Sequence, residues 1–112
     1  MTRIKNTPEC ERKFKEDFKK GLFSEDDGHV LKAWALEMEE YGPSYIENSL
    51  QWRDHPLLRE WLGYRASCFS LEGRIIYRII DEDEIEVCEI ERITPNHDYS
   101  KRFTHEKERR KK

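Results

Sequence analysis

The spacing of apolar residues changes once along this chain, near Tyr64, and that change limits what the chain can fold into. Before it, apolar side chains recur every three to four residues, which is typical of one face of a helix. After it, they alternate or form runs rich in β-branched residues, which is typical of strands. Because the helical part comes first and nothing repeats, we predict an α+β fold with two N-terminal helices packed on a three- to four-stranded antiparallel sheet.

Start and stop signals for helices divide the first part of the chain. Thr7-Pro8 is typical of an N-cap followed by proline in the first turn, and Gly21 is typical of a helix end. Ser24, followed by acidic residues, predicts the start of a second helix that ends at Gly42-Pro43. We predict a short third helical piece over residues 44–51.

The second part of the chain predicts three strands, over Tyr64–Leu71, Arg74–Ile80 and Glu84–Thr94. The middle one is apolar on both faces, so we place it centrally in the sheet. The alternation of the last strand slips near Cys88–Glu89, which predicts a β-bulge there. Residues 2–6 are predicted to form a short edge strand.

Composition bounds the class of protein. The chain has 112 residues, enough for one domain, which we place at 1–103 with a basic tail at 104–112. Charged residues make up 40% and no apolar run approaches the roughly 18 residues of a membrane span. The first residues lack the apolar stretch of a signal peptide, so we expect a cytoplasmic protein. Three cysteines without a CxxC pair predict reduced thiols.

Charge is distributed unevenly. Residues 101–112 hold seven basic and two acidic side chains, a net charge of +5, whereas the other 100 residues hold 14 basic and 22 acidic ones, a net charge of −8. Affinity for nucleic acid comes mostly from neutralising phosphates, so the acidic body argues against a generic nucleic-acid binder. The tail is predicted to be flexible, and it serves either solubility or contact with phosphates.

Two segments beside the predicted strands gather residues that can move protons and bind phosphate. They are Asp54-His55-Pro56-Leu57 and Thr94-Pro95-Asn96-His97-Asp98-Tyr99, the latter followed by Lys101 and Arg102. Two histidines titrating near neutral pH can serve as general base and general acid. Arginines can stabilise the charge that develops on phosphorus. Such a set suffices to cleave RNA through its 2′-hydroxyl without a metal or other cofactor.

Each candidate also has a structural interpretation. A histidine in a loop is most often solvated or capping, and Asp54 could cap its own turn. Trp61 and Tyr64 fit a core more readily than a platform for bases. Arg74 and Arg78 could pair with acidic residues of the next strand. No zinc-like spacing links the cysteines to the histidines, so a metal site is not predicted.

Taken together, these segments resemble the RelE/ParE toxin superfamily, and within it the YafQ-type mRNA interferases. The resemblance rests on Asp54-His55-Pro56-Leu57, Trp61, Gly63-Tyr64-Arg65, then Arg74-Ile75-Ile76-Tyr77-Arg78-Ile79, and a closing strand with a terminal histidine. It covers about residues 52–99. It implies helices packed on an antiparallel sheet, ribosome-dependent cleavage of mRNA, and an antitoxin partner that blocks the site.

The resemblance also implies roles for particular residues. His55 and His97 match two active-site histidines of the YafQ branch, and Tyr99 resembles the aromatic residue near the scissile site. Cys68 stands where that branch has another histidine, and Glu72-Gly73 stand where it has aspartate and tryptophan, so Glu72 could replace the aspartate. The cations expected to bind phosphate or RNA are Arg65, Arg74, Arg78, Lys101 and Arg102.

Three functions remain open at this point. The first is an mRNA endonuclease that acts on the ribosome, with the antitoxin, the ribosome and mRNA as partners and no membrane. The second is a ParE-like toxin that binds a protein target such as DNA gyrase and needs no histidine pair. The third is a descendant without toxicity that keeps the fold and binds a partner only, because one fold can carry all three functions.

Overall fold

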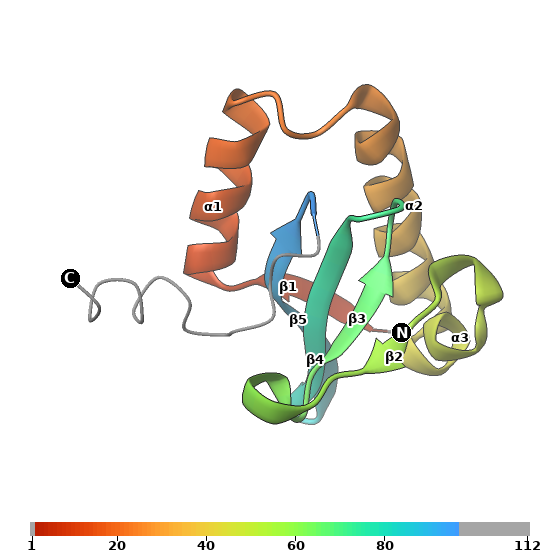
Figure 1. Cartoon of the computed structure of the whole chain (residues 1–112). Coiled ribbons are helices and arrows are strands. Elements are labelled where there is room, and N and C mark those ends of the chain that lie inside the picture. The colour runs from red at the N-terminus through yellow and green to blue at the C-terminus, as the bar shows by residue number, and fades with distance from the viewer. Residues whose placement is uncertain (1, 97–112) are drawn as a thin grey trace.

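The computed structural model describes residues 2–96, which form a layer of helices on a five-stranded sheet (Figure 1). The strands are β1 (Arg3–Asn6), β2 (His55–Pro56), β3 (Arg65–Cys68), β4 (Arg74–Glu82) and β5 (Ile85–Thr94). The helices are α1 (Pro8–Lys19), α2 (Glu25–Tyr41) and α3 (Pro43–Asn48), with short 3₁₀ helices η1 (Leu50–Trp52) and η2 (Arg59–Trp61). The predicted α+β class is confirmed.

Both long helices begin at the side-chain caps that the sequence predicts. The Thr7 hydroxyl accepts a hydrogen bond from the Cys10 N–H at 3.1 Å. Ser24 and Asp27 form a reciprocal capping box, in which each side chain accepts from the other residue's backbone N–H. Gly21 and Gly42 have φ angles of +76° and +88°, the left-handed region that glycine enters without steric cost at helix ends.

The strand order is β1-β5-β4-β3-β2, so β4 lies inside the sheet as predicted. The sheet has more strands than predicted because β2 contains only two residues and leaves no periodic signal. It is also mixed rather than purely antiparallel, because β1 runs parallel to β5. The remaining pairs are antiparallel. In Figure 1, α1 lies along the side of β1 and β5, and α3 lies beside β2.

The bulge falls two residues beyond the predicted segment, Cys88–Glu89. Between β4 and β5 the register shifts at Ile76/Tyr77, where Ile76 pairs with Arg92 and Tyr77 with Ile90, so Glu91 is the extra residue. The prediction at Cys88–Glu89 was wrong: the apolar alternation slips there because Ile90 faces the helices and Val87 does not, and no residue is left unpaired at that point. Val87 lies on the other face of the sheet and is nevertheless fully buried.

Each face of the sheet carries its own apolar cluster. Tyr77 and Ile90 face the helices and pack with Trp34 and Met38 of α2 in the larger cluster. On the opposite face, which we call the open face, Ile76 belongs to a smaller cluster. The other members of the smaller cluster are Trp61, Tyr64 and Ala66, with Leu57 at its edge. The loop that contains η2 therefore covers one end of the open face.

Candidate functional site on the open face of the sheet

The pairing register places His55 on the open face. His55 pairs with Ala66, which pairs with Ile76, which pairs with Arg92, and paired residues of neighbouring strands point to the same face. Arg74 and Arg78 are two positions either side of Ile76 on β4, so they lie on the same face, about 7 Å along the strand in each direction. The open face therefore brings together His55 and three arginines.

A backbone carbonyl orients the His55 ring. Nδ1 of His55 lies 2.9 Å from the carbonyl oxygen of Arg53. A carbonyl oxygen can only accept a hydrogen bond, so Nδ1 carries the proton in this contact. In the neutral ring the lone pair is then on Nε2, which is the nitrogen left to accept a proton.

Cys68 shares this carbonyl. Its Sγ atom lies 4.0 Å from the Arg53 oxygen, and Cys68 pairs with Arg74 across the sheet. Arg53 itself has a φ of +48°, a left-handed conformation that costs a non-glycine residue energy. The oxygen that holds His55 and Cys68 thus belongs to a residue in an uncommon backbone conformation.

The predicted cations of the described chain differ in their surroundings. Arg78 donates from Nε to Glu89 at 2.9 Å and lies over the Tyr64 ring, and the hydrogen bond to Glu89 raises the pKa of Arg78. Arg74 donates to the backbone carbonyls of Leu71 and Gly73 and so braces the turn before β4. Glu72 is exposed in that turn.

Arg65 lies on the opposite face of the sheet from His55. Its Nε donates to Asp54 at 2.5 Å and lies 3.6 Å from a carboxylate oxygen of Glu47 in α3. Burial lowers the pKa of Arg65 while the hydrogen bond and charge of Asp54 raise it, and the net direction is upward. The structure therefore does not bring Arg65 together with Arg74 and Arg78.

Sequence reasoning missed Arg92. Its guanidinium lies 5.4 Å from the centre of the Trp61 ring, in the same row as His55. Only the position of the bulge decides which face Arg92 occupies, and the sequence placed the bulge too early. The remaining predicted site residues, His97, Tyr99, Lys101 and Arg102, lie outside the described residues.

The glycine in the turn before β4 has a local reason. Gly73 is buried, and a Cβ atom at this position would overlap the ring of Phe69. Phe69 is 5% exposed and belongs to the cluster beneath the helices. A larger side chain at Gly73, such as the tryptophan that the resemblance leads one to expect, requires Phe69 to move.

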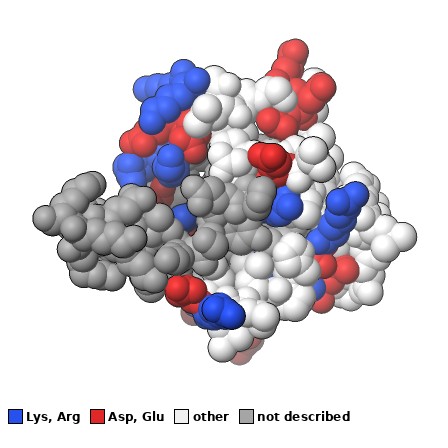
Figure 2. All heavy atoms as spheres, in the orientation of Figure 1, with Lys and Arg blue, Asp and Glu red and all other residues white. Residues whose placement is uncertain are grey.

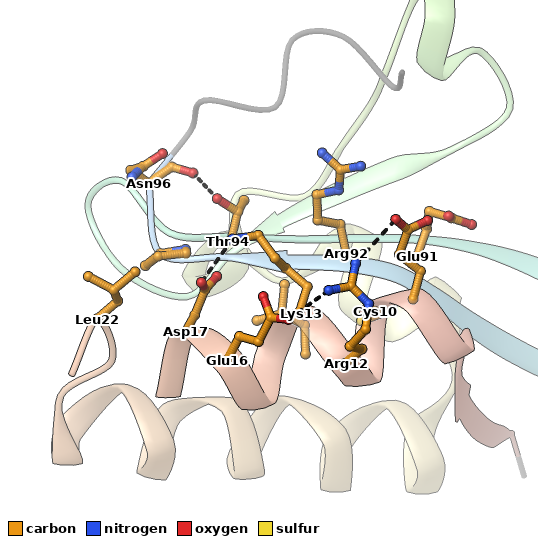
Figure 3. Close-up of a pocket in the computed structure, with 13 residues that line it drawn as sticks. Cys10, Arg12, Lys13, Glu16, Asp17, Leu22, Glu91, Arg92, Thr94 and Asn96 are labelled. Atoms are coloured by element: carbon orange, nitrogen blue, oxygen red, sulfur yellow. Dashed lines mark hydrogen bonds and ion pairs between the residues drawn. The ribbon is translucent and has the colours of Figure 1, made fainter. Parts of the chain in front are cut away.

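Two clefts adjoin the strands that carry the candidate site. The larger, of about 470 Å³, lies between α1 and β5 and is lined by charges of both signs, including the ion pairs Arg12–Glu16 and Lys13–Asp17 (Figure 3). Burial raises the pKa of the Cys10 thiol in its wall to about 12, which keeps that thiol protonated at neutral pH.

The smaller cleft, of about 370 Å³, is lined by Arg53 and Cys68 and so adjoins the His55 site.

Lys/Arg and Asp/Glu side chains are interspersed over the face seen in Figure 2. Within residues 2–96, no three His, Cys, Asp or Glu side chains group as metal ligands. No helix in this part of the chain is long and apolar enough to cross a membrane.

Comparison with known proteins finds similarity in structure only. No protein-family model matches the chain, and no curated protein matches it in sequence. Among solved structures, YafQ from E. coli strain BL21(DE3) superposes with a TM-score of 0.63 at 19% identity, covering 83% of this chain and 91% of that one. A copper-bound mutant toxin from Helicobacter pylori gives a TM-score of 0.63 at 18% identity, covering 87% and 96%.

The E. coli DinJ–YafQ complex gives a TM-score of 0.59 at 21% identity, covering 87% of this chain and 94% of that one. At these identities the likeness concerns the fold. The fold that the sequence resemblance implies, helices packed on a sheet as in YafQ and related toxins, is thereby confirmed.

Proposed function

Starting from the fold that this chain shares with YafQ and related toxins, we propose that it is the toxin of a type II toxin–antitoxin pair and that it cleaves mRNA on the ribosome. One observation carries the proposal. His55 stands on the open face with its Nδ1 bound to a backbone carbonyl, and its row across the sheet passes between Arg74 and Arg78 of β4. This arrangement leaves Nε2 as a proton acceptor on the same face of the sheet as arginines that can bind a phosphate.

The proposed reaction needs two proton transfers. Nε2 of His55 takes the proton from the 2′-hydroxyl, and the 2′-oxygen attacks the adjacent phosphorus. The bond from phosphorus to the 5′-oxygen breaks, and His97, in its imidazolium form, gives that oxygen a proton. The products are a 2′,3′-cyclic phosphate and a 5′-hydroxyl, so no water, metal or other co-reactant enters the cleavage step. We assign Tyr99 to contact with the nucleotide at the scissile bond, and Glu72 to proton relay or orientation in the turn before β4.

Charge stabilisation is assigned to the arginines of the open face. Arg74 and Arg78 flank the His55 row, and we add Arg92, which lies in that row. An arginine can hold two phosphate oxygens at once, which suits the extra negative charge of a pentacoordinate phosphorus. Lys101 and Arg102 would add phosphate contacts from the tail, whereas Arg65 would support the fold through Asp54.

The proposed protein partner is an antitoxin that covers the open face. YafQ has been solved in complex with DinJ, and YoeB in complex with YefM. By analogy, we expect a cognate antitoxin to present acidic side chains to Arg74, Arg78 and Arg92.

One observation favours a second candidate, a partner-binding descendant without nuclease activity. Glu89 neutralises Arg78, and Lys5 of β1 lies between Glu82 and Glu89 at 2.5 and 3.9 Å. The open face therefore has less net positive charge than its arginines suggest, which lowers its attraction for RNA.

A test in bacterial cells separates these functions. The wild type is expressed beside the double variant His55→Ala/His97→Ala, and primer extension is performed on a translated message. His29→Ala is the matched control, because His29 is exposed on α2. Discrete cuts in codon register from the wild type and His29→Ala, and none from the double variant, support the nuclease. Growth arrest without cuts in all three contradicts it and indicates a protein target, and no arrest from a folded product indicates the partner-binding descendant.

A further inference from the structure

We infer that Asp54 is the positioning residue for His55: its buried carboxylate fastens the two-residue strand β2 to β3 and β4 and thereby fixes the orientation of the His55 ring. The inference rests on the proposed function where it gives His55 a catalytic role. It concerns a residue that the sequence assigned only to a local turn.

The Asp54 carboxylate is fully buried, and both of its oxygens accept hydrogen bonds from protein side chains. Its side chain is 0% exposed. Oδ1 accepts from Arg65 Nε at 2.5 Å, and Oδ2 accepts from the Ser67 hydroxyl at 2.6 Å and from the Tyr77 hydroxyl at 2.6 Å. Ser67 in turn accepts from the Trp34 indole N–H at 3.0 Å. The network therefore joins β2 to β3, β4 and α2.

Tyr77 can act only as a donor in this network. Burial and then the charge of Asp54 raise its pKa far above the ordinary value, so the hydroxyl keeps its proton. A carboxylate that receives three such bonds is compensated for its loss of water. If one donor is removed, the buried carboxylate loses part of the compensation for its desolvation. The hydrogen bonds of the network therefore depend on one another.

Local geometry explains why this network acts on His55. β2 has only two paired residues, His55 with Ala66 and Pro56 with Arg65, and so short a strand is weakly held by backbone pairing alone. Successive side chains of a strand point to opposite faces. When Asp54 is anchored on the helix side, the next residue, His55, must point to the open face.

The same anchor fixes the carbonyl that binds the ring. Arg53 directly precedes Asp54, and its left-handed conformation directs its oxygen toward His55 Nδ1. If Asp54 loses its partners, Arg53 is free to relax to a more favourable backbone conformation, and the contact with Nδ1 is lost. His55 would then populate both neutral tautomers instead of one.

Stability alone is a weaker explanation for this network. Replacing buried ionic groups by apolar side chains of similar volume is often neutral or stabilising, so burial of a carboxylate is not needed to hold a core together. The Asp54 network shares Tyr77 and Trp34 with the larger apolar cluster, and its carboxylate lies directly before the one strand that carries His55.

The first arm of the test observes the ring directly. Long-range ¹⁵N–¹H spectra of the full chain, recorded at about pH 8, above the usual histidine pKa of about 6.5, report which ring nitrogen carries the proton. We expect one pyrrole-like Nδ1 and one pyridine-like Nε2 signal for His55 in the wild type, and averaged signals in Asp54→Asn. Tyr77→Phe and Ser67→Ala, which each remove one donor, are the milder variants if Asp54→Asn does not fold.

The second arm measures cleavage on programmed ribosomes. We expect the maximal rate of Asp54→Asn to fall on the order of 100-fold, with an unchanged toxin concentration at half-maximal rate, because a misplaced base affects the chemical step more than docking. Met38→Ala, a fully buried position on α2, controls for a general loss of stability. It should lower the melting temperature without changing the His55 spectrum.

The spectra and the cleavage assay can contradict the inference and the proposed function independently of each other. A folded Asp54 or Tyr77 variant whose His55 signals match the wild type overturns the inference, as does a Met38→Ala variant that disturbs them equally. A wild type that cleaves nothing overturns the proposed function, while the spectra still decide whether Asp54 positions His55.

Discussion

Trp61 offers the most direct test of whether the open face carries a true apolar core. Its side chain is 2% exposed and packs with Tyr64, Ala66 and Ile76. A tryptophan buries up to about 250 Å², and at about 25 cal/mol per Å² this gives an upper bound of about 6 kcal/mol. Because the surrounding loop can partly collapse, we expect Trp61→Ala to lower the free energy of unfolding by about 3–5 kcal/mol.

Urea unfolding followed by circular dichroism measures this loss, with Leu62→Ala as the matched control. Leu62 lies in the same loop but is 72% exposed, so its truncation should change the free energy of unfolding by less than about 0.5 kcal/mol. For a domain of this size, a loss of 3 kcal/mol lowers the melting temperature by roughly 12–24 °C. A loss below about 1 kcal/mol for Trp61→Ala, or equal losses for both variants, would refute the assignment of Trp61 to the core.

Three other predictions concern pH, the hairpin and phosphate binding. Burial raises the pKa of the Cys10 thiol to about 12 and raises those of the Cys88 thiol and Tyr77 hydroxyl, so the folded chain keeps protons that the unfolded chain releases. The free energy of unfolding should therefore stay constant as the pH rises to about 8.5 and decrease above that pH. Urea midpoints that rise between about pH 9 and 11 would contradict the predicted decrease. Asp83 and Glu84 have φ angles of +52° and +66° at the β4–β5 turn. The double variant Asp83→Asn/Glu84→Gly should therefore raise the free energy of unfolding by about 1 kcal/mol in the same urea assay. A loss of stability would show that the turn is not of the type that favours Asn-Gly. Arg78→Ala should slow cleavage while ribosome binding, measured by co-sedimentation, stays largely intact; loss of binding would make Arg78 a docking residue.

The sequence predicted the helices well because the interactions that start each helix are local. Thr7 and Ser24 act on backbone groups within three residues of themselves, so a sequence pattern suffices to place the helix starts. The parallel pairing of β1 with β5 depends on residues more than 80 positions apart, and no local pattern records it. The two-residue strand β2 exists only because β3 provides its hydrogen-bond partners.

The site was predictable only in part for the same reason. The segment around His55 was singled out from its residue types, but its face depends on the register of a short strand. Arg65 was grouped with Arg78 because both are basic strand residues, whereas the register places them on opposite faces. Glu91, as the bulged residue, decides that Arg92 joins the open face, and a period-two pattern cannot show which residue is left unpaired.

The measurement that tests the central claim most directly is the chemistry of the cleaved ends. Purified chain is mixed with ribosomes stalled on a defined message, beside the variants His55→Ala and His29→Ala, and the fragments are mapped and analysed for their terminal groups. The account predicts cuts at the ribosomal A site that leave 2′,3′-cyclic phosphate and 5′-hydroxyl ends, abolished by His55→Ala and unaffected by His29→Ala. Intact message with the wild-type chain, or equal cleavage by His55→Ala, would contradict it.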